Sequence, residues 1–415
     1  MIEVRHMKRI KKHLDSFLAQ FDDCIKTKPS RRHLRTYIGG QLSDLERKSV
    51  EPIALHAGTP VRTLQEFLQI HRWDEELVLK RIRDIIIRDH ASSDAIAVID
   101  ETSTPKKGNH TVGVQRQYCG ATGKRDNCVV SVHLGYAADG FHTLLDSDLF
   151  LPKDSWATDP DRRVEAKIPE DIAYLPKWKI ALNQLTRAVE NGVNFQWTTA
   201  DELYGGTSGF RRGVDALGIR YVVEIPRRVM GWTKQPVLEY PVESSKQGRP
   251  RIKPRLAENQ GKPRRVDDLW RRGGPSWTDY HVKDTEKGPL VWTARHTNFT
   301  VSHDGLPTED VRLIVAKNKR SGEVKYFLSN APEDVPVSKL MWVAFNRWRI
   351  ERMFQDAKGN VGLDHFEARR WKAVRRHLIL TMVSLLFLAR ETDILRGEKP
   401  VLEHPRCSPD RGGAA

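Results

Sequence analysis

Apolar residues recur at helical spacing over most of residues 1–90. Within residues 49–71, two short apolar stretches flank the turn HAGTP, which fits a helix-turn-helix with Arg62 and Gln65 on its second helix. An ordinary helical hairpin fits the same residues about as well. Residues 73–90 predict a further amphipathic helix. We therefore expect a helical N-terminal domain. If residues 49–71 form a helix-turn-helix, Arg62 would contact DNA.

The pattern changes at about residue 94, where short apolar runs of strand length begin. The run DAIAVID ends in Asp100 and has the profile of a buried strand whose carboxyl end is exposed. The elements predicted after it are strand 111–120, strand 127–137, helix 177–191, strand 194–201, helix 202–218 and strand 219–226. This order predicts an α/β core.

The α/β pattern is interrupted between residues 226 and 335. Residues 244–265 are rich in Pro, Gly and Arg and predict a loop or arm, whereas residues 311–330 predict a β-hairpin. Helices resume at residue 336, and the apolar run 378–389 is too short to span a bilayer and predicts a buried helix. The predicted domains are a helical, DNA-binding domain at 1–90, the first part of the core at 91–225, a β-rich insertion with a basic arm at 226–335, C-terminal core helices at 336–396 and a flexible tail at 397–415.

Charge narrows the class of partner. The 415 residues include 69 Lys and Arg against 54 Asp and Glu, a net charge of +15. Such an excess suits a polyanion, nucleic acid before anionic membrane. Residues 246–272 hold ten Lys or Arg against three acids, although such a run is as often a solvated face. The sequence shows no signal-peptide hydrophobic region and no CxxC pair. We expect a cytoplasmic, nucleoid-associated protein with no membrane partner.

Three acidic residues stand where a metal site would need them. Asp100 and Asp201 each end a predicted strand, and such side chains commonly meet at one edge of an α/β sheet. Glu351 lies on a predicted helix with Arg347 and Lys358, all within about 40° of one another on the helix surface. Carboxylates of this kind hold Mg²⁺ for phosphoryl transfer. Taken singly, either Asp is better explained as a turn residue or helix cap. For the helix, a solvated salt-bridge face is the alternative interpretation.

Taken together, these segments resemble a known family. IDETSTPKKG at 99–108, TTADELYGG at 198–206 and RWRIERMFQDAKG at 347–359 are similar to the catalytic segments of bacterial insertion-sequence transposases of the DDE type. Segments 31–52 and 359–371 also resemble the group named insertion-sequence family seven-oh-one. The resemblance implies a ribonuclease-H-like mixed sheet with helices, interrupted by a β-rich insertion and preceded by a helical N-terminal domain.

The resemblance also implies roles for individual residues. Asp100, Asp201 and Glu351 would be the catalytic residues and would ligate Mg²⁺, in two ions, with Mn²⁺ as a substitute. Arg347 and Lys358 match the Arg and Lys of the family's Y-R-E-K signature, and both would bind the DNA phosphates beside the cut. The Tyr of that signature is replaced by Ala344. Glu101 is a further candidate ligand, although strand alternation places it on the opposite side from Asp100.

Other DNA contacts are less specific. Lys106 and Lys107 follow the first catalytic segment, where they reach phosphate or simply form a surface turn. Relatives with this insertion stack a flipped base on a Trp, and Trp292 is our candidate. Each of the four Trp residues of the insertion is more easily explained as core: Trp232, Trp270, Trp277 and Trp292 itself. The His residues, including His365, show no ligand spacing and are interpreted as structural or DNA-contacting.

The function predicted by residues and resemblance together is that of a DNA transposase. It would cleave double-stranded DNA at the terminal inverted repeats of an insertion sequence and join the freed 3′-hydroxyl to target DNA, with two copies pairing the two ends. The alternatives are a ribonuclease-H-fold metal nuclease that does not transpose and a catalytically inactive DNA-binding regulator.

Overall fold

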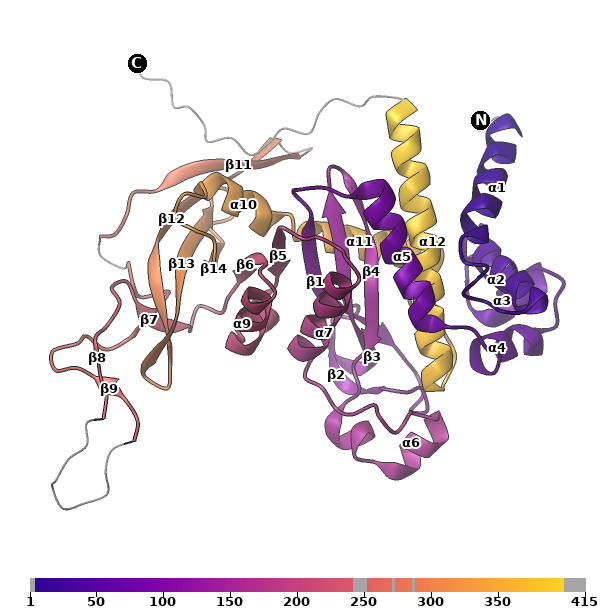
Figure 1. The fold of residues 1–415 in the computed structure, drawn as a ribbon, viewed down its shortest axis with the longest axis horizontal. Helices are drawn as coiled ribbons and strands as arrows, with labels where there is room; N and C mark the ends of the chain where they lie inside the picture. Colours follow the sequence, from indigo (N-terminus) through magenta and orange to yellow (C-terminus); the bar gives the residue numbers. More distant parts are fainter. Residues whose placement is uncertain (1–3, 242–251, 271–272, 286–287, 399–415) are drawn as a thin grey trace. The chain divides into compact units, whose positions relative to one another are not determined.

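The computed structural model describes residues 4–241, 252–270, 273–285 and 288–398 (Figure 1). The chain divides into two compact units. The first runs from the N-terminus to Trp197 and resumes at Arg347, and the second runs from Thr198 to Asn346. The boundaries of the five predicted domains stay predictions.

The first unit opens with five helices, α1 Val4–Ala19, α2 Lys28–Gln41, α3 Val50–His56, α4 Val61–Gln69 and α5 Glu75–His90. The short α3 and α4 flank a turn in which Gly58 adopts φ +61°, a backbone conformation that glycine takes without strain. Asp74 caps α5, because its side chain accepts a hydrogen bond from the backbone N–H of Leu77 at 3.0 Å. The helices predicted at 49–71 and 73–90 are confirmed.

Four antiparallel strands follow, β1 Ile96–Pro105, β2 Gln115–Cys119, β3 Lys124–Ala138 and β4 Phe141–Leu149, and β3 pairs with each of the others. The strand predicted to end at Asp100 continues to Pro105, so that prediction of its end was wrong. The polar run after Asp100 concealed the continuation, although Thr102 and Thr104 are buried and pair with β3.

Strand β4 was not predicted. It carries Asp146 and Asp148, which break the apolar pattern that marks a buried strand. Asp146 is nevertheless fully buried, because Arg83 Nη2 donates to it at 2.6 Å and Arg187 Nη2 at 3.0 Å. A buried carboxylate paired in this way is compatible with a core strand.

Helices cover both faces of this sheet. On one face lies α7 Lys177–Glu190, where the amide of Gln184 donates to the carbonyl oxygen of Val132 at 2.8 Å. On the other lies α11 Trp348–Val361, whose Phe354 ring contacts the ring of His133 at 5.2 Å between centroids. The elements between β4 and α7, a short π-helix at Lys153–Ala157 and α6 Pro160–Ala166, were not predicted.

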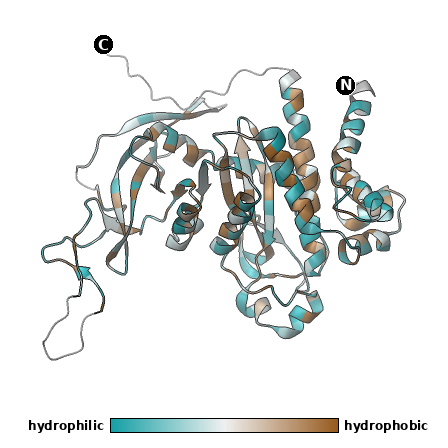
Figure 2. Ribbon diagram, in the orientation of Figure 1, coloured by the Kyte–Doolittle hydropathy of each residue, from teal (hydrophilic) through white to brown (hydrophobic). Residues whose placement is uncertain are grey.

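The long helix α12 Trp371–Glu398 runs beside α5 and β4 (Figure 1). Its middle part is apolar (Figure 2) and buried, as predicted for residues 378–389. Among the described residues, no helix is both long enough and apolar enough to cross a bilayer.

Polar side chains join α12 to the N-terminal helices. Tyr37 Oη lies 2.9 Å from His377 Nδ1, and the amide of Gln41 donates to Thr381 Oγ1 at 2.9 Å. Arg376, with 1% of its side chain exposed, donates to Glu75 and to the carbonyl oxygens of residues 67, 71 and 73. These bonds hold the C-terminal end of α4 and the start of α5 on α12.

The second unit contains β5 Trp197–Ala200 from Thr198 onwards, α8 Glu202–Gly205, α9 Ser208–Ala216 and β6 Arg220–Glu224, and α10 Val337–Phe345 is its last helix. Between β6 and α10 the described residues form strands and no helix: β7 Met230–Trp232, β8 Leu238–Glu239, β9 Arg255–Leu256, β10 Arg264–Arg265, β11 Thr278–Thr285, β12 Gly288–His303, β13 Leu306–Asn318 and β14 Val324–Ser329. The sheet order is β10-β7-β12-β13-β14-β6-β5, with β11 beside β12, and β8 pairs with β9.

The predicted α/β class, the β-rich segment and the hairpin at 311–330 are confirmed, the hairpin by β13 and β14. The helix predicted at 202–218 is two helices, α8 and α9. Of the arm predicted at 244–265, residues 244–251 lie outside the described residues, and the remainder includes β9 and β10.

Replacing Arg376 by Met should lower the free energy of unfolding by about 3–5 kcal/mol, because Glu75 and three carbonyl oxygens lose a buried partner. Urea denaturation of the full chain measures the loss. The control is Arg370→Met, which removes an exposed arginine that donates to Gln69 and should shift stability by less than about 0.5 kcal/mol. Equal losses in the two variants would contradict the role assigned to Arg376.

Candidate active site on strand β1 and helix α11

Two of the three predicted metal ligands lie on either side of one arginine. Arg347 Nη1 donates to Asp100 Oδ2 at 2.9 Å, and Arg347 Nη2 donates to Glu351 Oε1 at 3.1 Å. The side chain of Asp100 is 16% exposed, that of Arg347 21% and that of Glu351 62%. The first unit therefore brings Asp100, Arg347 and Glu351 into one cluster that solvent reaches from the side of Glu351.

Strand alternation explains why Asp100 faces α11. Its neighbour Glu101 points to the other face of the sheet and accepts a hydrogen bond from Lys177 Nζ of α7 at 2.7 Å. The predicted separation of these two acids is confirmed. Glu101 is thus held by α7 and is not part of the cluster around Arg347.

Helix α11 presents Glu351 because its opposite stripe is buried. Ile350, Met353 and Ala357 have little or no exposed surface. Below them in β3 is Gly135, where a Cβ would lie 2.6 Å from Met353 Sδ. The absence of a side chain at this position lets α11 pack closely on the sheet that carries Asp100.

The remaining residues of the predicted signature lie elsewhere. Lys358, in the last turn of α11, is half-buried, and burial lowers the pKa of its ammonium group. Ala344, at the place of the signature Tyr, is buried in α10 of the second unit. The role of Lys358 in phosphate binding stays a prediction.

Asp201 belongs to the second unit. It directly follows β5 and caps α8, since its Oδ1 accepts a hydrogen bond from the backbone N–H of Leu203 at 3.0 Å. Gly205 ends this short helix against β6: a Cβ there would overlap with the carbonyl oxygen of Glu224 and lie 2.9 Å from Val223 Cβ. The predicted position of Asp201, between a strand and a helix, is confirmed.

The chemistry of the cluster fits a divalent cation. Over the residues that the structure describes, no three His, Cys, Asp or Glu side chains form a ready metal-binding group. Asp100 and Glu351 nevertheless supply two carboxylates that already share one cationic partner. Mg²⁺ is commonly held by one or two carboxylates, with water and substrate phosphates as its other ligands. The two residues fit such an ion, and their role as ligands stays a prediction.

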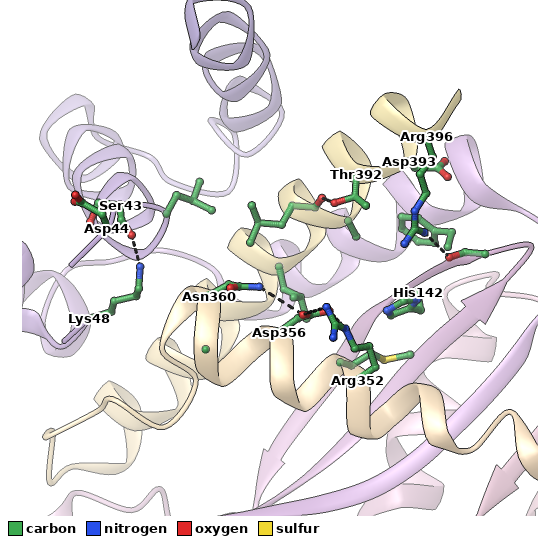
Figure 3. A pocket seen from close by; sticks show the side chains of 18 of the residues that line it. Ser43, Asp44, Lys48, His142, Arg352, Asp356, Asn360, Thr392, Asp393 and Arg396 are labelled. Atoms are coloured by element: carbon green, nitrogen blue, oxygen red, sulfur yellow. Dashed lines mark hydrogen bonds and ion pairs between the residues drawn. The ribbon is translucent and has the colours of Figure 1, made fainter. Parts of the chain in front are cut away.

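A further side of α11, next to its buried stripe, borders a cavity of about 670 Å³ (Figure 3). Asp356 points to this cavity and pairs with Arg352 at 3.1 Å, one turn away on the same helix. The two acids of α11 therefore belong to separate ion pairs: Glu351 pairs with Arg347, and Asp356 pairs with Arg352. Arg352 and Asp356 therefore provide matched comparisons for Arg347 and Glu351.

A second cavity, of about 1060 Å³, contains basic residues that the sequence did not single out. Exposed Arg47 and Arg369 line it together with Lys107, which the sequence did indicate. The three come from separate parts of the chain, so no local pattern could have assembled them. His365 also lines this cavity and accepts a hydrogen bond from the backbone N–H of Lys48 at 3.0 Å, a structural role.

Lys106 is directed into the fold. Its ammonium nitrogen lies 3.7 Å from the centre of the Phe366 ring and donates to the carbonyl oxygen of the same residue. Burial lowers the pKa of Lys106 to about 8. Lys106 is only partly exposed, whereas its neighbour Lys107, also predicted to contact DNA, is exposed.

Base stacking on Trp292 stays a prediction, and the residue is buried in this structure. Its ring is 3% exposed and packs against Phe345 at 4.7 Å between centroids, so neither face is open. Trp232 is buried as well, whereas Trp277 is 42% exposed and lies against the guanidinium of Arg295. Trp292 lies within β12 and Trp277 just before β11, and periodicity along the chain does not indicate which of the two is buried.

Arg62, the predicted DNA contact of the N-terminal helices, is 87% exposed on α4 and pairs with Glu66 at 2.9 Å. Such exposed pairs are weak, so they leave the arginine available to another anion. Its contact with DNA stays a prediction.

A family model described as DDE superfamily endonuclease matches residues 20–289. The chain belongs to this family. The DDE endonuclease is also similar to a probable transposase for insertion sequence element IS701 from Microchaete diplosiphon, at 30% identity over 188 residues. That match covers 45% of the chain and 46% of the relative, so the chain spans just under half of the relative's length. The resemblance and the ribonuclease-H-like fold class inferred from the sequence are confirmed.

The buried ammonium of Lys106 predicts a dependence of stability on pH. Between about pH 8 and the ordinary lysine pKa near 10.4, the folded endonuclease loses this proton while the unfolded chain keeps it. The unfolded state then binds more protons, so the contribution of Lys106 to stability rises with pH over this window. Urea denaturation measures the free energy of unfolding of the parent and of Lys106→Met. The value for the parent minus that for the variant should increase from pH 8 to 10. The same comparison with exposed Lys107→Met should stay flat, and a flat difference for both variants would contradict the prediction.

Proposed function

We propose that this DDE endonuclease is a DNA transposase that cleaves at the ends of an insertion sequence and joins the freed 3′-hydroxyl to target DNA. The observation that carries the proposal is the placement of Asp100 and Glu351 on either side of Arg347, in a chain of this family. The relative named as a transposase supports the same activity. The substrates are double-stranded terminal inverted repeats and target DNA, and two copies of the chain pair the two ends. The site of action is the nucleoid in the cytoplasm.

Asp100, Asp201 and Glu351 are the proposed catalytic residues and metal ligands. Two Mg²⁺ ions, or Mn²⁺ in their place, would supply charge stabilisation for the attacking and leaving oxygens of an in-line displacement. In the first step an oxygen of water attacks the phosphorus, and the 3′-oxygen leaves and takes up a proton. In the second step that 3′-hydroxyl loses its proton, attacks a target phosphorus and displaces the target's own 3′-oxygen. The carboxylates of the chain orient these oxygens and hold them in line.

DNA phosphates are proposed to bind along two basic surfaces of the first unit. One is the phosphate-binding cavity, defined by Arg47, Lys107 and Arg369. The other is the exposed side of α4 with Arg62. Exposed guanidinium and ammonium groups on an open cavity wall suit phosphate, whereas the acids in the same cavity, such as Glu367 paired with Arg47 at 3.2 Å, keep it from being purely cationic.

Glu351→Gln, Asp100→Asn and Asp201→Asn should each reduce cleavage of a labelled duplex carrying the element's end by about a hundredfold or more, since loss of an outer partner of a metal site already costs about ten- to a hundredfold. Binding of the duplex, measured in the same preparations by gel shift, should persist. Matched controls are Asp356→Asn on the other side of α11 and Glu101→Gln on the other face of β1. Both controls should cleave.

Three other outcomes would count against the proposal. Full cleavage by Glu351→Gln would remove the metal-site assignment. Cleavage by the parent without dependence on the end sequence, and without joining to a plasmid, would instead indicate a non-transposing nuclease. Binding without cleavage by every variant, the parent included, would indicate a DNA-binding regulator, for which α3 and α4 supply the structural basis.

Replacing Lys107 and Arg369 together by Ala should lower the slope of log affinity against log salt concentration by about 1–2, because each lost phosphate contact removes about one released counterion. Fluorescence anisotropy over a range of KCl concentrations measures the slope. The control is the double replacement of exposed Lys80 and Arg88 on α5, which removes the same charge elsewhere on the unit. If the slope falls equally in both variants, the loss follows from the lower net charge alone. That result would contradict phosphate binding in this cavity.

A further inference from the structure

We infer that Arg347 is an internal counter-ion that holds the two carboxylates of the metal site together and gives up Asp100 when a divalent cation binds. The inference rests on the proposed function, because it takes Asp100 and Glu351 as ligands. It assigns to Arg347 a role beyond phosphate binding. The arginine and the cation would compete for the same oxygen atoms.

The geometry indicates which atoms compete. Asp100 Oδ1 accepts a hydrogen bond from the backbone N–H of Glu101 at 2.8 Å, while Oδ2 accepts from Arg347 Nη1 at 2.9 Å. The other terminal nitrogen of Arg347 donates to Glu351 Oε1 at 3.1 Å. A guanidinium presents its donors in a rigid plane, so one arginine in this position fixes both carboxylates at once. Oδ2 of Asp100 is the oxygen that faces α11, and the arginine holds it.

Electrostatics explains why such a counter-ion is needed. Asp100 and Arg347 are mostly shielded from water, whereas Glu351 is 62% exposed, so Asp100 is the carboxylate at which repulsion by a second negative charge exceeds that in bulk solvent. The positive charge of Arg347 offsets this repulsion and keeps the ligands in place before any ion arrives. Mg²⁺ binds carboxylate oxygens at about 2.0–2.1 Å, much closer than a hydrogen bond. An ion on Oδ2 therefore displaces Nη1 of the arginine.

The displaced guanidinium then has donors to spare beside the reacting DNA. Arginine binds phosphate oxygens with paired N–H donors, so the released group would suit a phosphate next to the cut. Cation binding and DNA binding become coupled through one side chain, and coupling of this kind is reciprocal. The DNA raises the affinity for the cation by drawing the arginine away from Asp100, and the cation raises the affinity for DNA.

The test measures Mn²⁺ binding to the full chain without DNA, from the electron paramagnetic resonance signal of free Mn²⁺. Arg347→Gln should bind Mn²⁺ on the order of three- to tenfold more tightly than the parent, the gain expected from removing a partly buried competing ion pair. Arg347→Lys, which keeps the charge, should stay close to the parent. Arg352→Gln, an arginine of the same helix paired with Asp356, should leave the affinity unchanged.

A second arm adds the end duplex. The parent should bind Mn²⁺ more tightly with DNA than without it, and Arg347→Gln should lose most of that gain. Unchanged or weaker Mn²⁺ binding by Arg347→Gln without DNA, with its fold verified by circular dichroism, would overturn the inference. Failure of the proposed metal site gives a different pattern, in which Asp100→Asn and Glu351→Gln bind Mn²⁺ as the parent does.

Discussion

Helix α12 can lie in the interior of the first unit only because the polar groups it carries there meet partners. Arg376 binds Glu75 and the carbonyl oxygens that end α4, and His377 lies between Tyr37 of α2 and the carbonyl oxygen of Gly362, just after α11. Leaving any of these groups unpaired would cost more than the bond itself contributes. One helix therefore fixes both the pair α3–α4 and the helix that carries Glu351, so the proposed DNA contact on α4 and the acid on α11 share a common support.

Much of the fold could be predicted because apolar spacing and turn residues are local signals. The helix from Glu75, the hairpin of β13 and β14 and the buried part of α12 each carry a regular pattern. The failures have a common cause, which is polar residues made acceptable by partners far away in the sequence. Strand β4 was not predicted because the burial of Asp146 depends on Arg83 and Arg187. The predicted end of β1 was too early because the polar Thr102 and Thr104 are buried against β3. Tertiary pairing of this kind leaves no trace in a local window.

The candidate site divides in the same way. Helical spacing placed Glu351 and Arg347 on one stripe, and alternation in β1 separated Asp100 from Glu101. The insertion of Arg347 between the two acids depends on the packing of α11 on the sheet, which spacing along the chain does not specify. The inward turn of Lys106 onto Phe366 and the burial of Trp292 on Phe345 depend likewise on residues distant in sequence. The sequence therefore predicted the face of the helix or strand on which a residue lies better than the distant partner that its side chain contacts.

Gly205 illustrates a different kind of requirement. It ends the short helix capped by Asp201, and β6 leaves no room there for a Cβ. Every other amino acid has a Cβ, so Gly205 has no conservative replacement. Even a change to alanine should disrupt the packing of this helix on β6, as a change to a large residue would. A genetic screen for inactive copies of this gene would then recover lesions at Gly205 beside those at the acidic residues, even though the glycine takes part in no chemistry. In the segment DELYGG, Asp201 is required for its carboxylate and Gly205, four residues later, for the absence of a side chain.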